Sequence, residues 1–232
     1  TPNHLHAPQA KIALEHSCHV LVEKPFTLSS QDATELVALA NAQRKQLCVY
    51  QNRRFDGDFL TLAALIKEGT LGDIKRLDSR FDRFRPVPRN RWRENAGPGS
   101  GIFWDLGPHL IDQALQLFGQ PEAVSANILT LREGGQSDDT FDITLHYTDK
   151  MIKLGSSAFQ AGTTLRYDLQ GTKGSFRKFH LDPQENQLRA GLPFDDASWA
   201  TSEPTQDGVL ALVNESGDVV EQSIPTQKGE YL

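Results

Sequence analysis

Two short apolar runs flank a helical pattern within the first fifty residues, and this arrangement constrains the fold more than any other feature of the chain. The runs occupy residues 19–22 and 47–50. Between them, apolar residues recur at helical spacing over residues 33–40, after a serine at position 29 or 30 that can cap a helix. A strand, a helix and a second strand in this order predict a parallel pair of strands. The start of the chain therefore indicates part of an α/β sheet.

From about residue 73 the apolar pattern changes to period two, which is typical of strands. One helix is predicted over residues 105–118, and residues 181–206 are predicted to form a loop. The pattern thus predicts an α/β remnant in residues 1–52, followed in residues 53–232 by an α+β domain with one large, mostly antiparallel open sheet. The predicted strands lie near residues 124–131, 141–147, 152–159, 165–169, 175–180, 209–213 and 219–224.

Two strands are few for a parallel sheet, and the chain starts at Thr1 with its one methionine at position 151. We therefore expect that an N-terminal segment is missing. The last four residues carry no helix or turn signal, so we expect the same at the C-terminus.

Charge and composition exclude several classes of protein. The chain has 24 basic and 30 acidic residues, a net charge of −6, which does not favour binding to a nucleic acid backbone. No apolar run reaches the roughly 18 residues of a membrane span, and the N-terminus has no signal pattern. Two cysteines are too few for a disulfide framework and fit a reducing cytoplasm. The composition predicts a cytoplasmic protein with neither a nucleic acid nor a membrane as partner.

Lys24 directly follows a predicted buried strand. Ligands of open α/β sheets bind at the carboxyl ends of the strands, and Pro25 restricts Lys24 to an extended backbone. A lysine held there could donate hydrogen bonds to a substrate hydroxyl. The alternative is a surface lysine at the entrance to a loop.

Asp105 and His109 are four residues apart, which places both side chains on one face of the predicted helix. A carboxylate can orient an imidazole, and His109 could then act as a general base. Pro108 predicts that this pair lies in the first helical turn, where the helix terminus favours a neutral imidazole. The alternative is that Asp105 simply caps the helix.

Three other groups are less specific. Six arginines between Arg80 and Arg93, with Trp92 among them, could bind phosphate or a polyol, but interleaved acidic residues favour a solvated ion-pair surface. The glycine-rich segment 97–101 is not a dinucleotide fingerprint, and it could form a mobile active-site loop or a plain connector. Histidines and a cysteine within residues 4–19 match no zinc pattern, so no metal site is predicted.

Five segments together resemble the glucose–fructose oxidoreductase/inositol dehydrogenase (Gfo/Idh/MocA) family. They occur in the family's order and cover most of the chain to about residue 174. Residues 80–86 and 91–94 look like the branch that includes bacterial NADP-dependent scyllo-inositol dehydrogenases. The five segments are TPNHLH (1–6), VEKPF (22–26), QNRRF (51–55), LGDI (71–74) and GIFWDLGPHLID (101–112).

The resemblance implies a Rossmann domain followed by an open-sheet domain, and hydride transfer between a nicotinamide and a sugar or cyclitol hydroxyl. Lys24, Asp105 and His109 fall on the family's catalytic positions, with a cis peptide bond before Pro25. In this interpretation His109 exchanges the hydroxyl proton, Lys24 polarises that oxygen and Asp105 orients its partners. The substrate would lie near Arg91 and Trp92, as well as Asp105 and His109. The implied cofactor-binding residues are Thr1, Pro2, Asn3, His6, Glu23, Lys24, Pro25 and Asn52.

The family's glycine fingerprint and the residue that selects NAD or NADP would lie before Thr1, within roughly seventy further residues. The cofactor is therefore predicted only as NADP or NAD, and we expect this fragment to be inactive alone. The family commonly pairs through the open sheet face, so a homo-oligomer is expected. Two other functions stay open, a non-catalytic assembly module and a polyol-binding regulator on the same fold.

Overall fold

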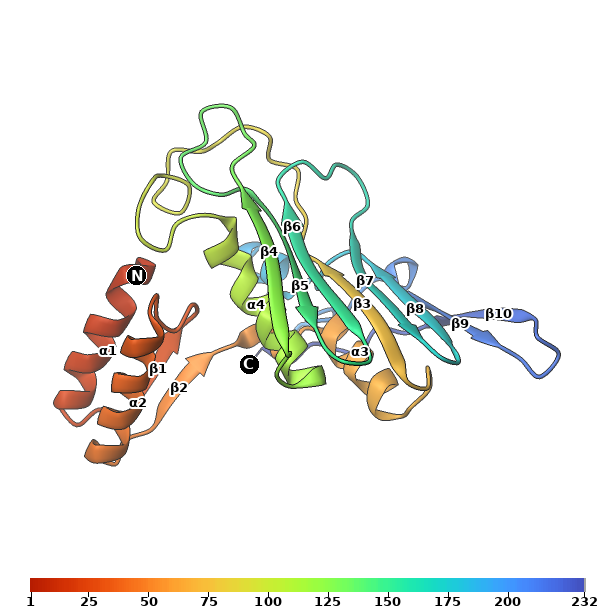
Figure 1. Cartoon of the computed structure of the whole chain (residues 1–232), viewed down its shortest axis with the longest axis horizontal. Helices are drawn as coiled ribbons and strands as arrows, with labels where there is room; N and C mark the ends of the chain where they lie inside the picture. The colour runs from red at the N-terminus through yellow and green to blue at the C-terminus, as the bar shows by residue number, and fades with distance from the viewer. Residues whose placement is uncertain (232) are drawn as a thin grey trace. The chain divides into compact units, whose positions relative to one another are not determined.

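A computed structural model describes residues 1–231, and the chain separates into two compact units (Figure 1). The first unit holds Thr1–Gln51, Val87–Pro108 and Ile128–Thr140. The second holds Asn52–Pro86, His109–Asn127 and the chain from Phe141 onward. Two interior segments thus join the N-terminal residues in the first unit. The predicted domain boundary at residue 52 stays a prediction.

The first unit contains the predicted strand–helix–strand arrangement. Strands β1 (Val20–Glu23) and β2 (Leu47–Tyr50) pair in parallel, with Val20 opposite Leu47. Helix α2 (Ser30–Gln43) joins them, and the Ser29 hydroxyl caps it by accepting hydrogen bonds from the amides of residues 31 and 32. The short helix η1 (Asn3–Leu5) and helix α1 (His6–Glu15) precede β1. Leu14, Val22 and Leu36 are buried together in the core of this unit.

An eight-stranded sheet dominates the rest of the chain and confirms the predicted fold class. Strand β3 pairs with β6 in parallel, whereas β7, β8, β9 and β10 follow β3 as antiparallel neighbours. The strand order is β10-β9-β8-β7-β3-β6-β5-β4. The bounds are β3 (Ile74–Arg80), β4 (Ala123–Leu129), β5 (Thr140–His146), β6 (Met151–Ser157), β7 (Leu165–Gly171), β8 (Gly174–Phe179), β9 (Gly208–Val213) and β10 (Val219–Ile224).

The helices of this part of the chain are η2 (Asn52–Phe55), α3 (Gly57–Lys67), α4 (Ile102–Phe118), α5 (Gln184–Arg189) and η3 (Pro204–Gln206). Two predictions are corrected here. Residues 181–206 are not simply a loop, because they contain α5 and η3. Helix α4 begins at Ile102 rather than near residue 105.

Strands β3 and β6 of the large sheet alternate between a buried apolar side and a charged side. Leu77 on β3 and Ile152 on β6 are buried, whereas Arg76, Asp78 and Lys153 lie on the other side. Period-two alternation of this kind places apolar residues on the core face. The exposed side of β3 and β6 is therefore charged.

Strand β7 contains an irregularity that repositions one charged residue. Opposite β8, Leu165 pairs with Phe179 and Tyr167 with Lys178, so Arg166 is an extra residue in the strand. A bulge of this kind redirects a side chain. Simple alternation predicts Arg166 on the face opposite Tyr167, yet both residues are buried.

No helix within residues 1–231 combines the length and apolar character needed to cross a bilayer.

Candidate functional site

Lys24 lies where strand β1 has ended, beside the carboxyl edge of the parallel pair. The Lys24–Pro25 peptide bond is cis, as the family resemblance implies. The Pro25 carbonyl lies 2.7 Å from Nδ1 of His6. Because a carbonyl oxygen can only accept, the proton must be on Nδ1 of this buried imidazole. The start of α1 is thus tied to the segment that carries Lys24.

The Lys24 ammonium contacts Asp105 through two oxygens. Its Nζ donates to the Asp105 main-chain carbonyl at 2.6 Å and to Oδ1 at 3.3 Å. The Arg93 guanidinium adds a second cation, with Nε 3.7 Å from the same Oδ1. The Lys24 side chain is 16% exposed and that of Asp105 25% exposed, so the surface-lysine alternative is wrong. The pair is fixed but open to water and to a ligand.

The N-terminus of α4 depends on a residue from a distant loop. The amide of Ile102 donates to the Asp138 main-chain carbonyl at 2.8 Å, and that of Phe103 donates to the Asp138 carboxylate at 2.6 Å. These bonds satisfy amides that a helix leaves without internal partners. Gly101 has a φ of +99°, and a Cβ there would lie 1.9 Å from the Asp138 carboxylate. Asp138 therefore requires glycine at the start of this helix.

Asp138 also explains why two sequence-based interpretations of α4 are wrong. It adds residues 102–104 to the helix, so Asp105 ends the first turn instead of capping it. Pro108 lies inside the helix, and His109 is in the second turn. The effect of the helix dipole fades within the first turn, so it no longer argues for a neutral His109.

His109 is buried, with 4% of its surface exposed, and it belongs to the second unit. It follows Asp105 by one helical turn on α4. The structure thus brings Lys24 and Asp105 together within the first unit and places His109 on the same helix as Asp105.

Two family models match residues of both the N-terminal strands and the large sheet. The GFO/IDH/MocA C-terminal domain model matches residues 59–177, and the model of the oxidoreductase family with an NAD-binding Rossmann fold matches residues 1–51. The chain belongs to the Gfo/Idh/MocA family. The match to the Rossmann model also confirms that the first strands are part of a dinucleotide-binding fold.

Relatives of this Gfo/Idh/MocA chain include enzymes of known activity. It is 46% identical over 231 residues to the uncharacterized oxidoreductase YdgJ of Escherichia coli, and 38% identical over 232 residues to the NADP-dependent scyllo-inositol 2-dehydrogenase IolW of Bacillus subtilis. All of this chain aligns with 66% of YdgJ and 64% of IolW. The chain therefore spans just under two thirds of the length of these relatives.

Solved structures give the same assignment. The Yersinia pestis protein YPO2259 superposes with a TM-score of 0.93 at 43% identity, covering all of this chain and 64% of that protein. An oxidoreductase from Bacillus cereus superposes with a TM-score of 0.90 at 37% identity, covering all of this chain and 67% of that one.

The predicted cofactor residues of this Gfo/Idh/MocA chain do not share one environment. Asn3 is buried, and its Nδ2 donates to the Gly99 carbonyl at 2.8 Å. This bond anchors the glycine-rich segment to the start of the chain. Thr1 and Glu23 are exposed and Pro2 is half-buried, all within the first unit, whereas Asn52 begins η2 in the second unit.

Two buried polar atoms lack a hydrogen-bonding partner at this edge of the first unit. They are Nε2 of His6 and Oε1 of Gln51, which directly follows β2. Buried polar atoms of this kind normally have partners. One acceptor nitrogen and one amide oxygen fit the polar groups of a nicotinamide and its ribose. These residues are therefore compatible with a bound nicotinamide cofactor.

The predicted substrate residues Arg91 and Trp92 are partly exposed in the first unit. Arg91 donates to Glu94 at 2.6 Å, and the Arg93 guanidinium stacks on the Trp92 ring at 4.6 Å. Burial opposes ionisation of Glu94, but its hydrogen bonds from Arg89, Arg132 and Arg91 outweigh burial and lower its pKa. Arg93, rather than Arg91, reaches Asp105. In the sequence, Arg93 was marked only by its place beside Trp92 in the arginine-rich segment, and nothing there indicated its contact with Asp105.

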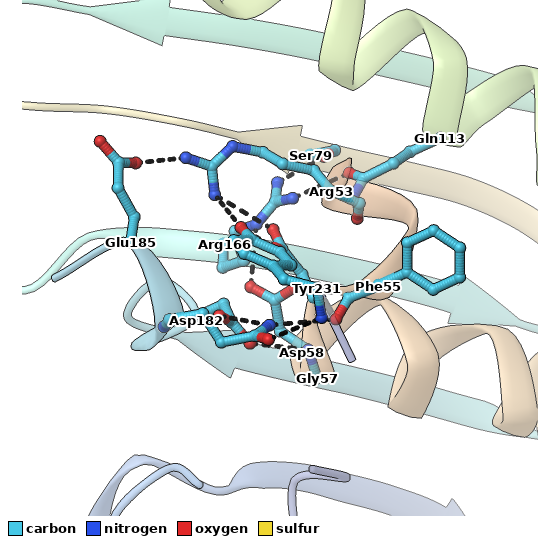
Figure 2. A network of polar contacts seen from close by, with 12 residues as sticks. Arg53, Phe55, Gly57, Asp58, Ser79, Gln113, Arg166, Asp182, Glu185 and Tyr231 are labelled. Atoms are coloured by element: carbon cyan, nitrogen blue, oxygen red, sulfur yellow. Dashed lines mark hydrogen bonds and ion pairs between the residues drawn. The ribbon is translucent and has the colours of Figure 1, made fainter. Parts of the chain in front are cut away.

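A second charged cluster, largely buried in the second unit, was missed by sequence reasoning (Figure 2). Arg166 donates to Asp58 of α3 at 3.1 Å and to Oε1 of Gln113 of α4 at 2.8 Å. Arg53 donates to Glu185 and, at 3.0 Å, to the Tyr231 hydroxyl. These bonds join α3, α4 and β7, so they hold the helix that carries His109 against the sheet. No local pattern predicts them, since the partners are far apart in sequence.

Proposed function

We propose that the whole protein containing these residues is an NAD(P)-dependent oxidoreductase. It transfers a hydride between a nicotinamide and a secondary hydroxyl of a sugar or cyclitol. The observation that carries this proposal is the Lys24 ammonium, paired with Asp105 at the carboxyl end of a parallel strand. Both residues occupy catalytic positions implied by the Gfo/Idh/MocA family. A fixed cation beside a partly exposed carboxylate suits recognition of a hydroxyl group.

Each residue has a distinct role in this proposal. The Lys24 Nζ donates to the substrate oxygen and polarises it, while Asp105, with Arg93 beside it, orients the ammonium. His109 exchanges the proton of the same hydroxyl, which is general acid–base catalysis. The nicotinamide, when bound, supplies the hydride acceptor or donor. His6, Asn3 and Gln51 would hold its nicotinamide end, together with the other predicted residues Thr1, Pro2, Glu23, Pro25 and Asn52.

The relative IolW supports a finer substrate class. Its name gives NADP and scyllo-inositol, and it is 38% identical to this chain. We therefore place an inositol-like cyclitol first among the substrates and NADP before NAD. The protein is also proposed to be cytoplasmic and to form a homo-oligomer. The charged face of the large sheet, with Arg76, Asp78 and Lys153, can pair with a second copy through opposite charges.

The test is turnover by the complete gene product that contains these residues, with scyllo-inositol and a panel of sugars. Lys24→Met and His109→Gln should each lower kcat by about 10²- to 10⁴-fold, the usual contribution of a positioned acid–base group. Arg177→Met is the matched control, because that arginine is exposed and outside the site. The 232-residue chain alone should show no turnover, and robust NADP-dependent turnover by it would contradict this part of the proposal.

The same variants separate the alternatives. Loss of turnover with intact assembly supports the enzyme. Unchanged biological function in both variants would favour the assembly module. Polyol binding without any hydride transfer by the wild-type protein would favour the regulator.

A further inference from the structure

An ion pair joins the short helix η2 to helix α4 one turn after His109. Arg54 of η2 donates from Nε to Oδ2 of Asp112 at 2.7 Å and from Nη2 to Oδ1 at 2.6 Å. Two parallel bonds between a guanidinium and a carboxylate fix the orientation of both groups as well as their distance. Asp112 follows His109 by three positions, so the two side chains lie on the same face of α4.

A second contact beside this ion pair ties the same two elements together. Nε2 of Gln113, the residue after Asp112, donates to the Arg53 carbonyl at 2.6 Å, and this bond is buried (Figure 2). Oε1 of Gln113 accepts in turn from Arg166 of β7. Two consecutive residues of η2 thus contact two consecutive residues of α4. Such a double contact opposes rotation of α4 about its own axis relative to η2.

Helix α4 needs external support at this point, because its own hydrogen bonding is weak there. Pro108 lies inside the helix and has no amide hydrogen, so the carbonyl four positions earlier lacks its usual helical donor. The residue before it is Gly107, and glycine is among the residues that favour a helix least. The turn that begins at His109 is therefore held less firmly by the helix itself, and the contacts with η2 supply support from outside.

We propose that Arg54 and Asp112 are positioning residues, whose ion pair holds the His109 imidazole in the orientation that proton transfer requires. The inference rests on the proposed role of His109 as the acid–base group. Helix η2 begins with Asn52, a residue expected near the nicotinamide, and all four residues belong to the second unit. The ion pair thus links the element expected to contact the cofactor with the helix expected to carry the acid–base group.

The exposure of the pair separates this role from a purely structural one. The side chain of Arg54 is 40% exposed and that of Asp112 is 15% exposed. Partly exposed ion pairs contribute little to stability. The buried bonds of Gln113 remain when the pair is broken, so α4 stays packed on the sheet while the turn with His109 loses its fixed orientation. Turnover should therefore suffer far more than stability.

The test is turnover by the complete protein with the best substrate of the sugar and cyclitol panel. Asp112→Asn keeps the shape of the side chain and should lower kcat by about 10- to 100-fold, the cost of misplacing a reacting group by about 1 Å. Arg54→Met should give a similar loss, and the double variant should be no worse than either single one, because all three break the same contact. Asp168→Asn is the matched control, since that carboxylate is 16% exposed and pairs with the exposed Arg177.

The His109→Gln background distinguishes positioning from a general loss of structure. Without the imidazole the ion pair has nothing to position, so adding Asp112→Asn should lower kcat no further. Equal losses of kcat in the wild-type and His109→Gln backgrounds would overturn the inference, and so would a loss in the Asp168→Asn control as large as that in Asp112→Asn.

The same measurements separate this inference from the proposed function. If His109→Gln lowers kcat but Asp112→Asn does not, only the positioning role is wrong. If His109→Gln leaves kcat unchanged, the proposed role of His109 is wrong, and the positioning role is wrong with it. Urea denaturation of each variant should give a midpoint close to that of the wild type, which shows that lost turnover does not come from unfolding.

Discussion

Two ion pairs of similar chemistry occupy opposite extremes of solvent exposure. In the first unit, the Lys24 and Asp105 side chains keep 16% and 25% of their surface exposed. In the second unit, the Arg166 and Asp58 side chains keep 0% and 1%. When the Lys24–Asp105 pair is broken, water can form most of the hydrogen bonds that the two charged groups lose. No water reaches the buried Arg166 and Asp58 side chains to replace their lost partners. The exposed pair is suited to binding a ligand, and the buried pair is suited to fixing the fold.

The buried pair depends on a nearly complete set of hydrogen bonds. Besides Asp58 and Gln113, the Arg166 guanidinium donates to the Ser79 hydroxyl at 3.1 Å and the Arg80 carbonyl at 3.3 Å. Removing one member of such a set leaves the other charge buried and unpaired, which is strongly destabilising. The comparison therefore predicts large stability effects in the second unit and small ones at the candidate active site.

The largest effect is expected for Arg166→Met. This change leaves the Asp58 carboxylate buried without its cation, and we expect it to lower the free energy of unfolding by about 3–5 kcal/mol. The measurement is urea denaturation followed by circular dichroism. Arg177→Met on the adjacent strand β8 removes an exposed arginine and should change stability by less than about 0.5 kcal/mol. Equal decreases in the free energy of unfolding for Arg166→Met and Arg177→Met would contradict the contrast between buried and exposed arginines.

A smaller effect is expected for Asp138→Ala in the first unit. The change removes the oxygen that accepts from the Phe103 amide, and loss of such a cap costs about 1–2 kcal/mol. Ser29→Ala, which removes the cap of α2, provides a matched comparison of similar size. A change below the error of urea denaturation would show that α4 starts at Ile102 without help from Asp138.

Two carboxyl groups, Asp182 in the second unit and Glu94 in the first, should contribute pH dependences of stability with opposite signs. Burial raises the pKa of Asp182, so the folded state keeps a proton that the unfolded chain has released. Stability therefore falls as pH rises from the ordinary aspartate pKa through the raised one, and Asp182→Asn should flatten this fall. Glu94, with its lowered pKa, contributes stability above the ordinary glutamate pKa that is lost as pH falls through the folded value. Glu94→Gln should therefore flatten only the acid side, and identical pH profiles for the two variants would contradict these assignments.

The smallest effect on stability is expected for Lys24→Met. A partly exposed ion pair contributes about 1 kcal/mol or less, so urea denaturation should show a change within that range. The same variant is expected to lose turnover in the complete protein. A loss of stability comparable to that of Arg166→Met would mean that Lys24 is mainly structural.

Local patterns explain what the sequence could predict. The strand–helix–strand order and the Ser29 cap depend on residues close together in the chain, and both are observed. The pairing of Lys24 with Asp105 was within reach only because both residues fall in motifs of one family. Asp138 could not be predicted as the cap of α4, because it lies 35 positions from Phe103 and no local signal marks it. Arg166 was missed because the bulge in β7 moves it to the face that alternation assigns to its neighbours.

Tyr231 has a consequence for the growing chain on the ribosome. Its hydroxyl, placed 175 positions after Asp56, donates to that carboxylate at 2.5 Å and accepts from Arg53. Domains generally begin to fold from the N-terminal side during synthesis. Here, Asp56 is synthesised 175 residues before Tyr231, the residue whose hydroxyl donates to it. Until Tyr231 has been synthesised, Arg53 and Asp56 lack their shared hydroxyl partner, so the second unit can complete its buried cluster only after that residue has emerged.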